Sequence, residues 1–186
     1  MAKKDEIIVL IGTMDTKGPE FSFIKKEIES KGYKTLVVDT GILGKPKIKV
    51  DIPKEEVAKK GGYSLEELVA AAKKGADRSA GTSAMTEGAI KMVNILLSDG
   101  KLDGILSLGG SQGTAMGMEI MKVLPLGLPK IMVTTDLDLQ DFDDRDIMMI
   151  QAPADIFGLN TIIKKMLLQA VGAMDGMLES KKLQDR

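Results

Sequence analysis

Five short apolar runs constrain the fold of this chain more than any other feature of its sequence. The runs cover residues 7–11, 35–38, 104–108, 130–134 and 147–150. They are rich in β-formers and do not alternate polar with apolar positions, which is typical of strands covered on both faces. The sequence therefore predicts a parallel sheet buried between two layers of helices.

Helical patterns fill the segments between these runs. Pro19 suits the first turn of a helix that Gly32 ends. Apolar stripes at helical spacing follow near residues 85–96, 116–123 and 159–178, and shorter helices are expected near 53–60 and 64–73. Asp155 is expected to cap the last helix. This order predicts an α/β fold with an open parallel sheet and helices on both faces, in a single domain over residues 1–186.

The amino-acid composition excludes several kinds of catalytic, disulfide and metal-binding chemistry. The chain has no cysteine and no histidine, which excludes disulfides, a Cys nucleophile, a Ser-His-Asp triad and a Cys/His zinc site within it. A hard cation such as Mg²⁺ remains compatible with its carboxylates. Lys plus Arg number 26 against 27 for Asp plus Glu, so no general attraction for nucleic acid or a membrane surface is expected. With no signal-peptide pattern and no apolar stretch of the ~20 residues that span a bilayer, the expected location is the cytoplasm.

The loop over residues 12–18 directly follows the first run and precedes a helix. In open parallel sheets, ligands bind beyond the carboxyl ends of the strands, so this loop is a candidate site. Gly12 permits close approach of a ligand, and Thr13, Thr16 and Lys17 offer donors for a phosphate group. Asp15 could orient a ribose or a metal-bound water. The alternative is an ordinary turn between strand and helix with a capping threonine.

The loop over residues 109–114 stands in the same position after the third run. It consists of Gly109, Gly110, Ser111, Gln112, Gly113 and Thr114. Glycines interleaved with hydroxyl groups, placed between a strand and a helix, favour an anion cradle. The alternative is a tight turn without a ligand.

Two further segments carry candidate residues. Asp39, Thr40 and Gly41 follow the second run, where an acidic residue often meets ribose hydroxyls, although a strand-ending Asx turn is an equal alternative. Arg78 could contact a phosphate bidentately. The alternative for Arg78 is a solvated side chain just before a helix capped by Thr82 or Ser83.

An acidic stretch follows the fourth run, with Asp at positions 136, 138, 141, 143, 144 and 146. Clustered carboxylates can bind Mg²⁺ or Ca²⁺, but the glycine and closing glutamate of a calcium loop are missing. A solvated acidic loop is therefore the favoured interpretation.

The last helical pattern is apolar around most of its circumference. The apolar positions are 156, 159, 162, 163, 166, 167, 168 and 171. Such a helix is deeply buried or lies at a subunit interface. The sequence therefore predicts a homodimer formed through this helix.

Four strings of residues together resemble the Tm-1-like ATP-binding domain family, also known as UPF0261. They are Ile-Gly-Thr-Met-Asp-Thr-Lys-Gly at 11–18, Val-Val-Asp-Thr-Gly-Ile-Leu-Gly-Lys-Pro at 37–46, Leu-Gly-Gly-Ser-Gln-Gly-Thr at 108–114 and Asp-Ile-Phe-Gly-Leu-Asn at 155–160. The resemblance spans roughly residues 5–178.

This resemblance implies a Rossmann-like fold and an ATP-binding function, with Mg²⁺ as a possible companion of ATP. The implied ATP contacts are Gly12, Thr13, Asp15, Thr16, Lys17, Asp39, Thr40, Gly41 and residues 109–114, with Arg78 as a further candidate. Family members usually carry a second, barrel-type domain. The open alternatives are a regulatory or assembly module, one half of a two-part hydrolase or transferase whose catalytic residues lie on a separate chain, and a dimeric scaffold without a ligand.

Overall fold

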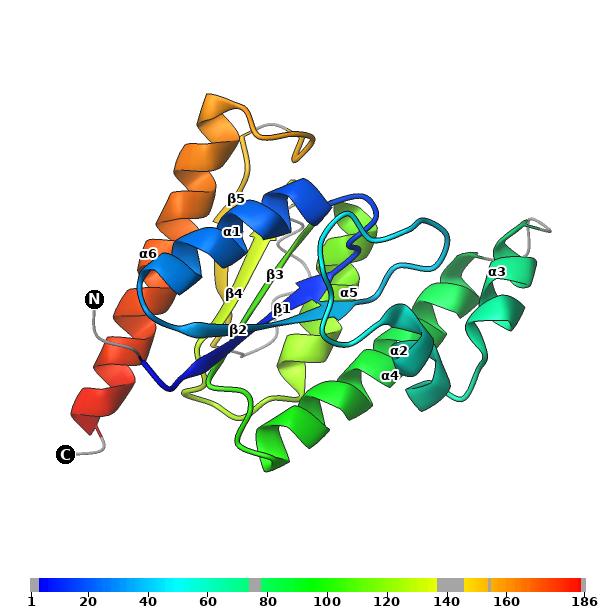
Figure 1. Ribbon diagram of the computed structural model, residues 1–186, viewed down its shortest axis with the longest axis horizontal. Coiled ribbons are helices and arrows are strands. Elements are labelled where there is room, and N and C mark those ends of the chain that lie inside the picture. The colour runs from blue at the N-terminus through cyan, green and yellow to red at the C-terminus, as the bar shows by residue number, and fades with distance from the viewer. Residues whose placement is uncertain (1–3, 74–77, 137–145, 154, 185–186) are drawn as a thin grey trace.

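The computed structural model describes residues 4–73, 78–136, 146–153 and 155–184, and Figure 1 shows their arrangement. The strands are β1 (Ile7–Gly12), β2 (Lys34–Asp39), β3 (Gly104–Gly109), β4 (Lys130–Thr134) and β5 (Met148–Gln151). The helices are α1 (Gly18–Ser30), α2 (Lys54–Lys60), α3 (Leu65–Lys73), α4 (Arg78–Ser98), α5 (Ser111–Lys122) and α6 (Thr161–Gln184). Each predicted apolar run is a strand, within two residues at either end.

The five strands form one sheet in the order β2-β1-β3-β4-β5, and every neighbouring pair is parallel. The predicted α/β fold with an open parallel sheet is thereby confirmed, and its arrangement is Rossmann-like. The chain moves outward from β1 to β2 and then returns past β1 to β3. The strand order therefore switches direction between β1 and β3, which is the point where open α/β sheets bind ligands.

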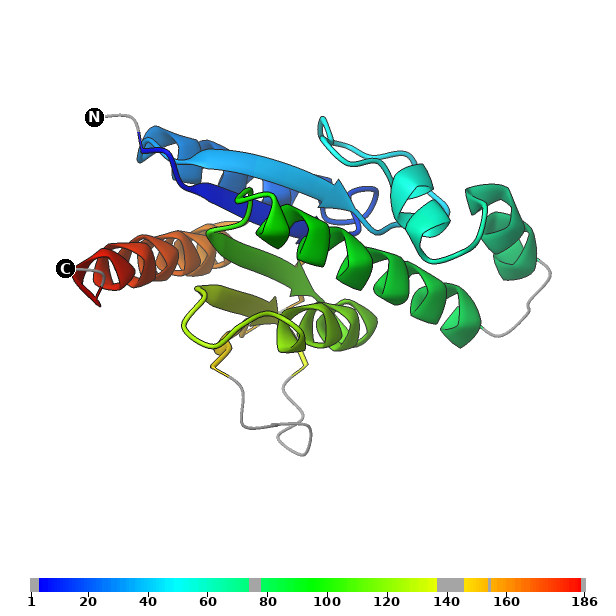
Figure 2. The same cartoon turned by 90° about the horizontal axis from the view of Figure 1, so that it is seen from below.

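Helices cover both faces of the sheet, as Figures 1 and 2 show, and an apolar layer lies between the helices and the strands on each face. Successive side chains of a strand point to opposite faces, so Ile8 and Leu10 join one layer while Val9 and Ile11 join the other. The first layer is completed by apolar residues of α1 and α6, and the second by those of α2 to α5. Burial on both faces explains why the strands lack polar–apolar alternation.

Two helices begin at positions other than the helix caps considered from the sequence. Helix α4 begins at Arg78, so Thr82 and Ser83 lie inside it instead of capping it. Hydroxyl side chains fit a helix interior when they bond back to the preceding turn, as Thr86 does to the carbonyl oxygen of Thr82 at 2.8 Å.

The last helix is capped by Asn160 and not by Asp155. The Oδ1 atom of Asn160 accepts the Ile163 N–H at 2.9 Å. Gly158, with a φ of 80°, turns the chain between the two candidate caps. Because a helix cannot pass through that left-handed position, α6 has to begin after it.

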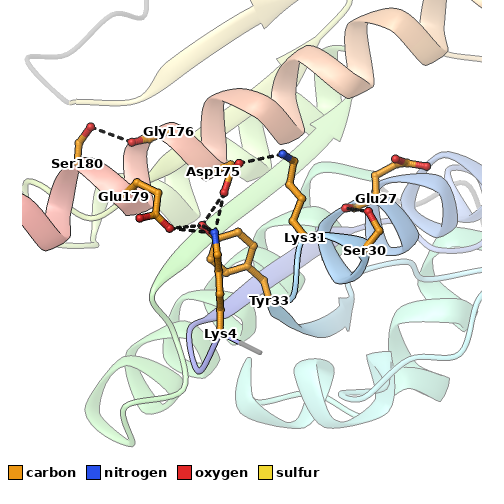
Figure 3. A network of polar contacts seen from close by, with 9 residues as sticks. All are labelled: Lys4, Glu27, Ser30, Lys31, Tyr33, Asp175, Gly176, Glu179 and Ser180. Carbon is orange, nitrogen blue, oxygen red and sulfur yellow. Dashed lines mark hydrogen bonds and ion pairs between the residues drawn. The ribbon is translucent and has the colours of Figure 1, made fainter. Parts of the chain in front are cut away.

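A polar cluster joins the beginning of the chain to α6 and the end of α1 (Figure 3). The Lys4 Nζ atom donates to the Tyr33 hydroxyl at 2.8 Å, to Asp175 Oδ1 at 3.0 Å and to Glu179 Oε1 at 2.9 Å. The Tyr33 hydroxyl donates to Asp175 at 2.7 Å, and Lys31 donates to the other Asp175 oxygen at 2.8 Å. We call these five residues the Asp175 cluster. It lies at the amino-terminal edge of the sheet, away from the strand ends where ligands are expected.

Partial burial and mutual contact shift the pKa values within the Asp175 cluster. Burial alone would raise the pKa of Asp175, but its bonds to Lys31, Tyr33 and Lys4 hold that pKa well below the usual range. Burial raises the pKa of Tyr33 to about 12. At neutral pH the Asp175 carboxylate therefore stays ionised and the Tyr33 hydroxyl stays protonated.

No helix within the described residues is long and apolar enough to cross a membrane.

Candidate functional site

A cavity of about 390 Å³ opens at the carboxyl edge of the sheet, beside the ends of β1 and β3. This is the switch point of the strand order, and the volume falls in the range of small-molecule sites. Its described lining residues are Ile11, Gly12, Thr13, Asp15, Thr16, Thr40, Gly41, Ile42, Leu43, Leu68, Ala71, Ala72, Gly81, Thr82, Ser107, Leu108, Gln112, Gly113, Met116, Gly117 and Ile120. The cavity thus joins three of the predicted loops to the second helical layer.

The loop after β1 contributes polar side chains to the cavity, whereas α3 contributes only apolar ones. The loop after β1 supplies Thr13 and Thr16, and the first turn of α5 supplies Gln112. Helix α3 supplies an aliphatic wall of Leu68, Ala71 and Ala72. A ligand with a polar end and an apolar end matches this division.

The loop after β1 is fixed by its own hydrogen bonds. The Thr13 and Thr16 hydroxyls lie 2.7 Å apart, and the Lys17 N–H donates to the Thr13 carbonyl at 2.9 Å. The Lys17 side chain runs to the segment before α6, where its Nζ atom donates to the Ile156 carbonyl oxygen. Lys17 is therefore not among the residues that line the cavity.

Gly12 is required by close packing. A Cβ atom there would lie 2.7 Å from the Phe21 ring, which is fully buried beneath the loop. Glycine lets the strand end lie directly against the first layer of the core.

The predicted glycine loop at 109–114 is mostly strand end and helix start. Strand β3 ends at Gly109 and α5 begins at Ser111, with Gly110 as its N-cap. A Cβ atom at Gly109 would lie 2.7 Å from the Cα atom of Gly113, so the strand end packs directly on the first helical turn. Gln112 and Gly113 line the cavity. The N–H groups of a first helical turn have no partner inside the helix, which leaves them available to an anion.

The two hydroxyl groups of this segment are engaged outside the cavity. The Ser111 hydroxyl donates to Asp136 Oδ2, and the Thr114 hydroxyl lies 2.7 Å from that of Thr134. Ser111 and Thr114, like Gly109 and Gly110, are not among the lining residues of the cavity, and they support its wall.

Asp39 forms an Asx turn at the end of β2. Its Oδ1 atom accepts the Gly41 N–H at 2.9 Å and the Met14 N–H at 3.0 Å, which ties two loops together. Asp39 is 1% exposed and lies beneath the cavity, whereas Thr40 and Gly41 line it.

Burial raises the pKa of Asp39. The N–H groups of Gly41 and Met14 and the ammonium group of Lys54 oppose this change, while the Asp15 carboxylate adds to it. Lys54 is itself buried, and its Nζ atom donates to the carbonyl oxygens of Ile42 and Gly44. Two carboxylates, those of Asp15 and Asp39, and the ammonium group of Lys54 therefore interact at the floor of the cavity.

Three buried oxygen atoms in this region have no hydrogen-bond partner. They are Asp15 Oδ1, Asp39 Oδ2 and Thr40 Oγ1. Buried polar atoms are nearly always paired, and exceptions often mark a place where a ligand or ion completes the site.

Arg78 begins α4, and its side chain lies outside the described residues. From the same helix, Gly81 and Thr82 line the cavity. Neither this contribution nor the α3 wall was predicted from the sequence, because the motifs that indicate a strand-end site lie in loops. The i, i+3, i+4 spacing of Leu68, Ala71 and Ala72 was the available signal of a shared helix face.

Much of the acidic stretch, residues 137–145, lies outside the described residues. Of the rest, Asp146 forms an ion pair with the buried Lys130 at 2.7 Å and accepts the Gly127 N–H at 2.6 Å, so it anchors neighbouring loops. Within the part of the chain that the structure describes, no group of three or more carboxylates could hold a metal ion by itself.

Comparison with known proteins gives a consistent set of similarities. A family model described as "Uncharacterised protein family (UPF0261) N-terminal domain" matches residues 6–183. A "UPF0261 protein" of Clostridium tetani is 41% identical over 177 residues, which cover 94% of this chain and 43% of that protein. A relative from Brucella suis is 35% identical over 173 residues, covering 91% and 40%. The chain thus spans about two fifths of the length of these relatives.

A plant protein shows a shorter similarity. The "ToMV resistance protein Tm-1(GCR237)" of Solanum lycopersicum is 30% identical over 105 residues, which cover 53% of this chain and 14% of that protein.

Proposed function

This chain belongs to the UPF0261 N-terminal domain family, and from that premise we propose that it binds a nucleotide, ATP in the first place, in the cavity beyond β1 and β3. The observation that carries the proposal is the place of this cavity. It lies at the switch point of a parallel sheet and is flanked by the first turn of α5.

The division of the cavity suggests how a nucleotide lies in it. The phosphates would face the Thr13 and Thr16 hydroxyls and the first turn of α5 at Gln112 and Gly113. The base would lie against the aliphatic wall of α3 and the side chain of Met116. The ATP identity follows from the motif resemblance at residues 11–18, 37–46 and 108–114.

The proposed role is regulation or assembly. Helix α6 retains exposed apolar side chains, with Ile162 58% and Leu168 45% exposed. These side chains support a homodimer contact through this helix.

Isothermal titration calorimetry with ATP, with and without Mg²⁺, tests the binding proposal on the wild-type chain and two variants at Gly113. A Cβ atom at Gly113 meets its nearest neighbour, the Leu108 carbonyl oxygen, only at 3.7 Å, so Gly113→Ala should fold and bind. Gly113→Asp adds a negative charge that suits a helix N-terminus but repels phosphate. We expect Gly113→Asp to lose at least about tenfold in affinity, while Gly113→Ala stays within about twofold of the wild type.

Wild-type protein that gives no binding heat at millimolar ATP would overturn the proposal. Equal ATP affinity of the two Gly113 variants would show that the phosphates do not bind at the first turn of α5.

A second candidate function is suggested by the length of the relatives. Since this chain spans about two fifths of them, it would form the nucleotide-binding half of a hydrolase or transferase whose catalytic residues lie in the remaining part. Comparing ATP turnover by a full-length relative and by this chain alone tests it. Rapid turnover by this chain alone would exclude a catalytic role confined to the other part.

A further inference from the structure

Asp15 is the sole charged side chain among the described residues that line the cavity. A carboxylate alone would repel the phosphates of a nucleotide. The described lining provides hydroxyls and helix N–H groups for an anion, but no ammonium or guanidinium group. The site therefore needs positive charge near Asp15 if a polyphosphate is to bind there.

The Asp15 carboxylate is held in a fixed position between two glycines. Its Oδ2 atom accepts the Gly44 N–H at 3.0 Å, and a Cβ atom at Gly44 would lie 2.4 Å from that oxygen. On the other side, a Cβ atom at Gly41 would lie 3.1 Å from Asp15 Oδ1 and 3.1 Å from Asp39 Oδ1. Glycine at both positions leaves the carboxylate enclosed yet lets it line the cavity.

Buried oxygens without a hydrogen-bond partner occur in this part of the structure. Asp15 Oδ1, Asp39 Oδ2 and Thr40 Oγ1 are buried without a hydrogen-bond partner. Thr40 is 2% exposed and lines the same cavity as Asp15. Lys54 offsets one of the two carboxylates, and its ammonium group already bonds two carbonyl oxygens. Hard oxygen donors with an excess of negative charge match the preferences of Mg²⁺.

We propose that Asp15 anchors a divalent cation of the Mg²⁺ class, which bridges its carboxylate to a phosphate of the bound nucleotide, with the Thr40 hydroxyl beside it. The inference rests on the proposed function, because the phosphate completes the coordination. Mg²⁺ commonly binds in this way, through one or two carboxylates, substrate phosphate and retained water. Asp39 acts as a positioning residue that fixes Gly41 and the Met14 backbone around Asp15.

Calorimetry of ATP in EDTA and in Mg²⁺ tests the cation directly on three proteins. They are the wild type, Asp15→Asn and Asp136→Asn. Asparagine at 15 keeps an oxygen for the Gly44 N–H, and a thermal melt confirms that the variant folds. Asp136 is a matched carboxylate outside the cavity lining, where it accepts a hydrogen bond from the Ser111 hydroxyl. We expect Mg²⁺ to strengthen ATP binding at least about tenfold in the wild type and Asp136→Asn, and hardly at all in Asp15→Asn.

Electron paramagnetic resonance of Mn²⁺ gives a second readout that does not depend on binding heats. We expect protein-immobilised Mn²⁺ in the presence of ATP with the wild type, and only the freely tumbling Mn²⁺–ATP complex with Asp15→Asn. Each other outcome overturns the inference in a recognisable way. Equal ATP affinity in EDTA and in Mg²⁺ would contradict the proposed cation but would leave the proposed nucleotide binding standing. Weaker ATP binding by Asp15→Asn in EDTA would assign Asp15 to the ribose, and loss of the Mg²⁺ effect in Asp136→Asn would place the cation at Asp136 instead. Absence of ATP binding both in EDTA and in Mg²⁺ would contradict the proposed function as well as the inference about the cation.

Discussion

The two ends of the sheet differ in how their polar and charged side chains are paired. At the amino-terminal edge, the Asp175 cluster pairs every carboxylate oxygen of Asp175 with lysine or tyrosine (Figure 3). At the carboxyl edge, Asp15, Asp39 and Thr40 each keep an oxygen without a partner. Paired groups contribute to stability, whereas unpaired buried groups cost free energy unless something else satisfies them. The comparison therefore distinguishes an amino-terminal edge whose paired groups stabilise the fold from a carboxyl edge whose unpaired groups are available to a ligand.

Removing Asp175 should produce the largest change. Asp175→Ala deletes charge-assisted bonds to three residues, so we expect a loss of about 2 kcal/mol in the free energy of unfolding and a fall of roughly 4–8 °C in Tm. ATP affinity should remain that of the wild type. Chemical denaturation and calorimetry measure both quantities, and Asp99→Ala, which removes an exposed pair with Lys101, is the control. A change in ATP affinity would break the proposed separation of the two edges.

Acid should weaken the same cluster. The folded pKa of Asp175 lies below its ordinary value of about 3.9, so its stabilisation is present above that pH and is lost as the pH falls through the folded pKa. Thermal melts between pH 7 and pH 2 should show the difference between wild type and Asp175→Asn shrinking in this acid range. A difference that stays constant down to pH 2 would mean that charge on Asp175 contributes nothing.

Two threonines allow a matched test of paired and unpaired hydroxyls. The Thr35 hydroxyl accepts from Lys25 and donates to Glu29, both at 2.6 Å, whereas the Thr40 hydroxyl has no partner. We expect Thr35→Val to lose about 1 kcal/mol of stability and Thr40→Val to lose almost none. Denaturant titration of both variants measures the difference, and equal losses would contradict the contrast.

The smallest effect is expected at Asp39. Burial raises its folded pKa, so the ionised group reduces stability above its ordinary pKa, and this penalty disappears as the pH falls below about 4. Asp39→Asn keeps an oxygen for the two backbone N–H groups and should gain about 0.5 kcal/mol at pH 7 and nothing at pH 3. Denaturation at the two pH values measures it. A loss at pH 7 would show that the negative charge is needed, for example by Lys54.

Much of the fold could be predicted because the strand signals are local. Unbroken apolar runs such as 104–108 identify strands buried on both faces, and Pro19 and Gly32 delimit a helix. The start of α6 could not be predicted, since Asp155 and Asn160 are both good caps. The left-handed turn at Gly158 decided between them.

The candidate site could be predicted in part. Sequence reasoning identified the loops after β1, β2 and β3, but it could not separate residues that face the cavity from those that support it. Lys17 and Ser111 have the chemistry of phosphate donors, yet their side chains bond to Ile156 and Asp136. Side-chain direction depends on neighbours far along the chain, and a local motif does not encode it.

By itself the sequence determined the kind of fold, the edge of the sheet where the cavity opens, and the absence of histidine and cysteine chemistry. Those properties follow from residue type and from local order along the chain. Only the tertiary structure showed that α3 and α4 complete the cavity and that the Asp15 carboxylate packs between Gly41 and Gly44. The physical reason is that packing brings together residues far apart in sequence, and only packing shows which buried oxygens remain without a partner.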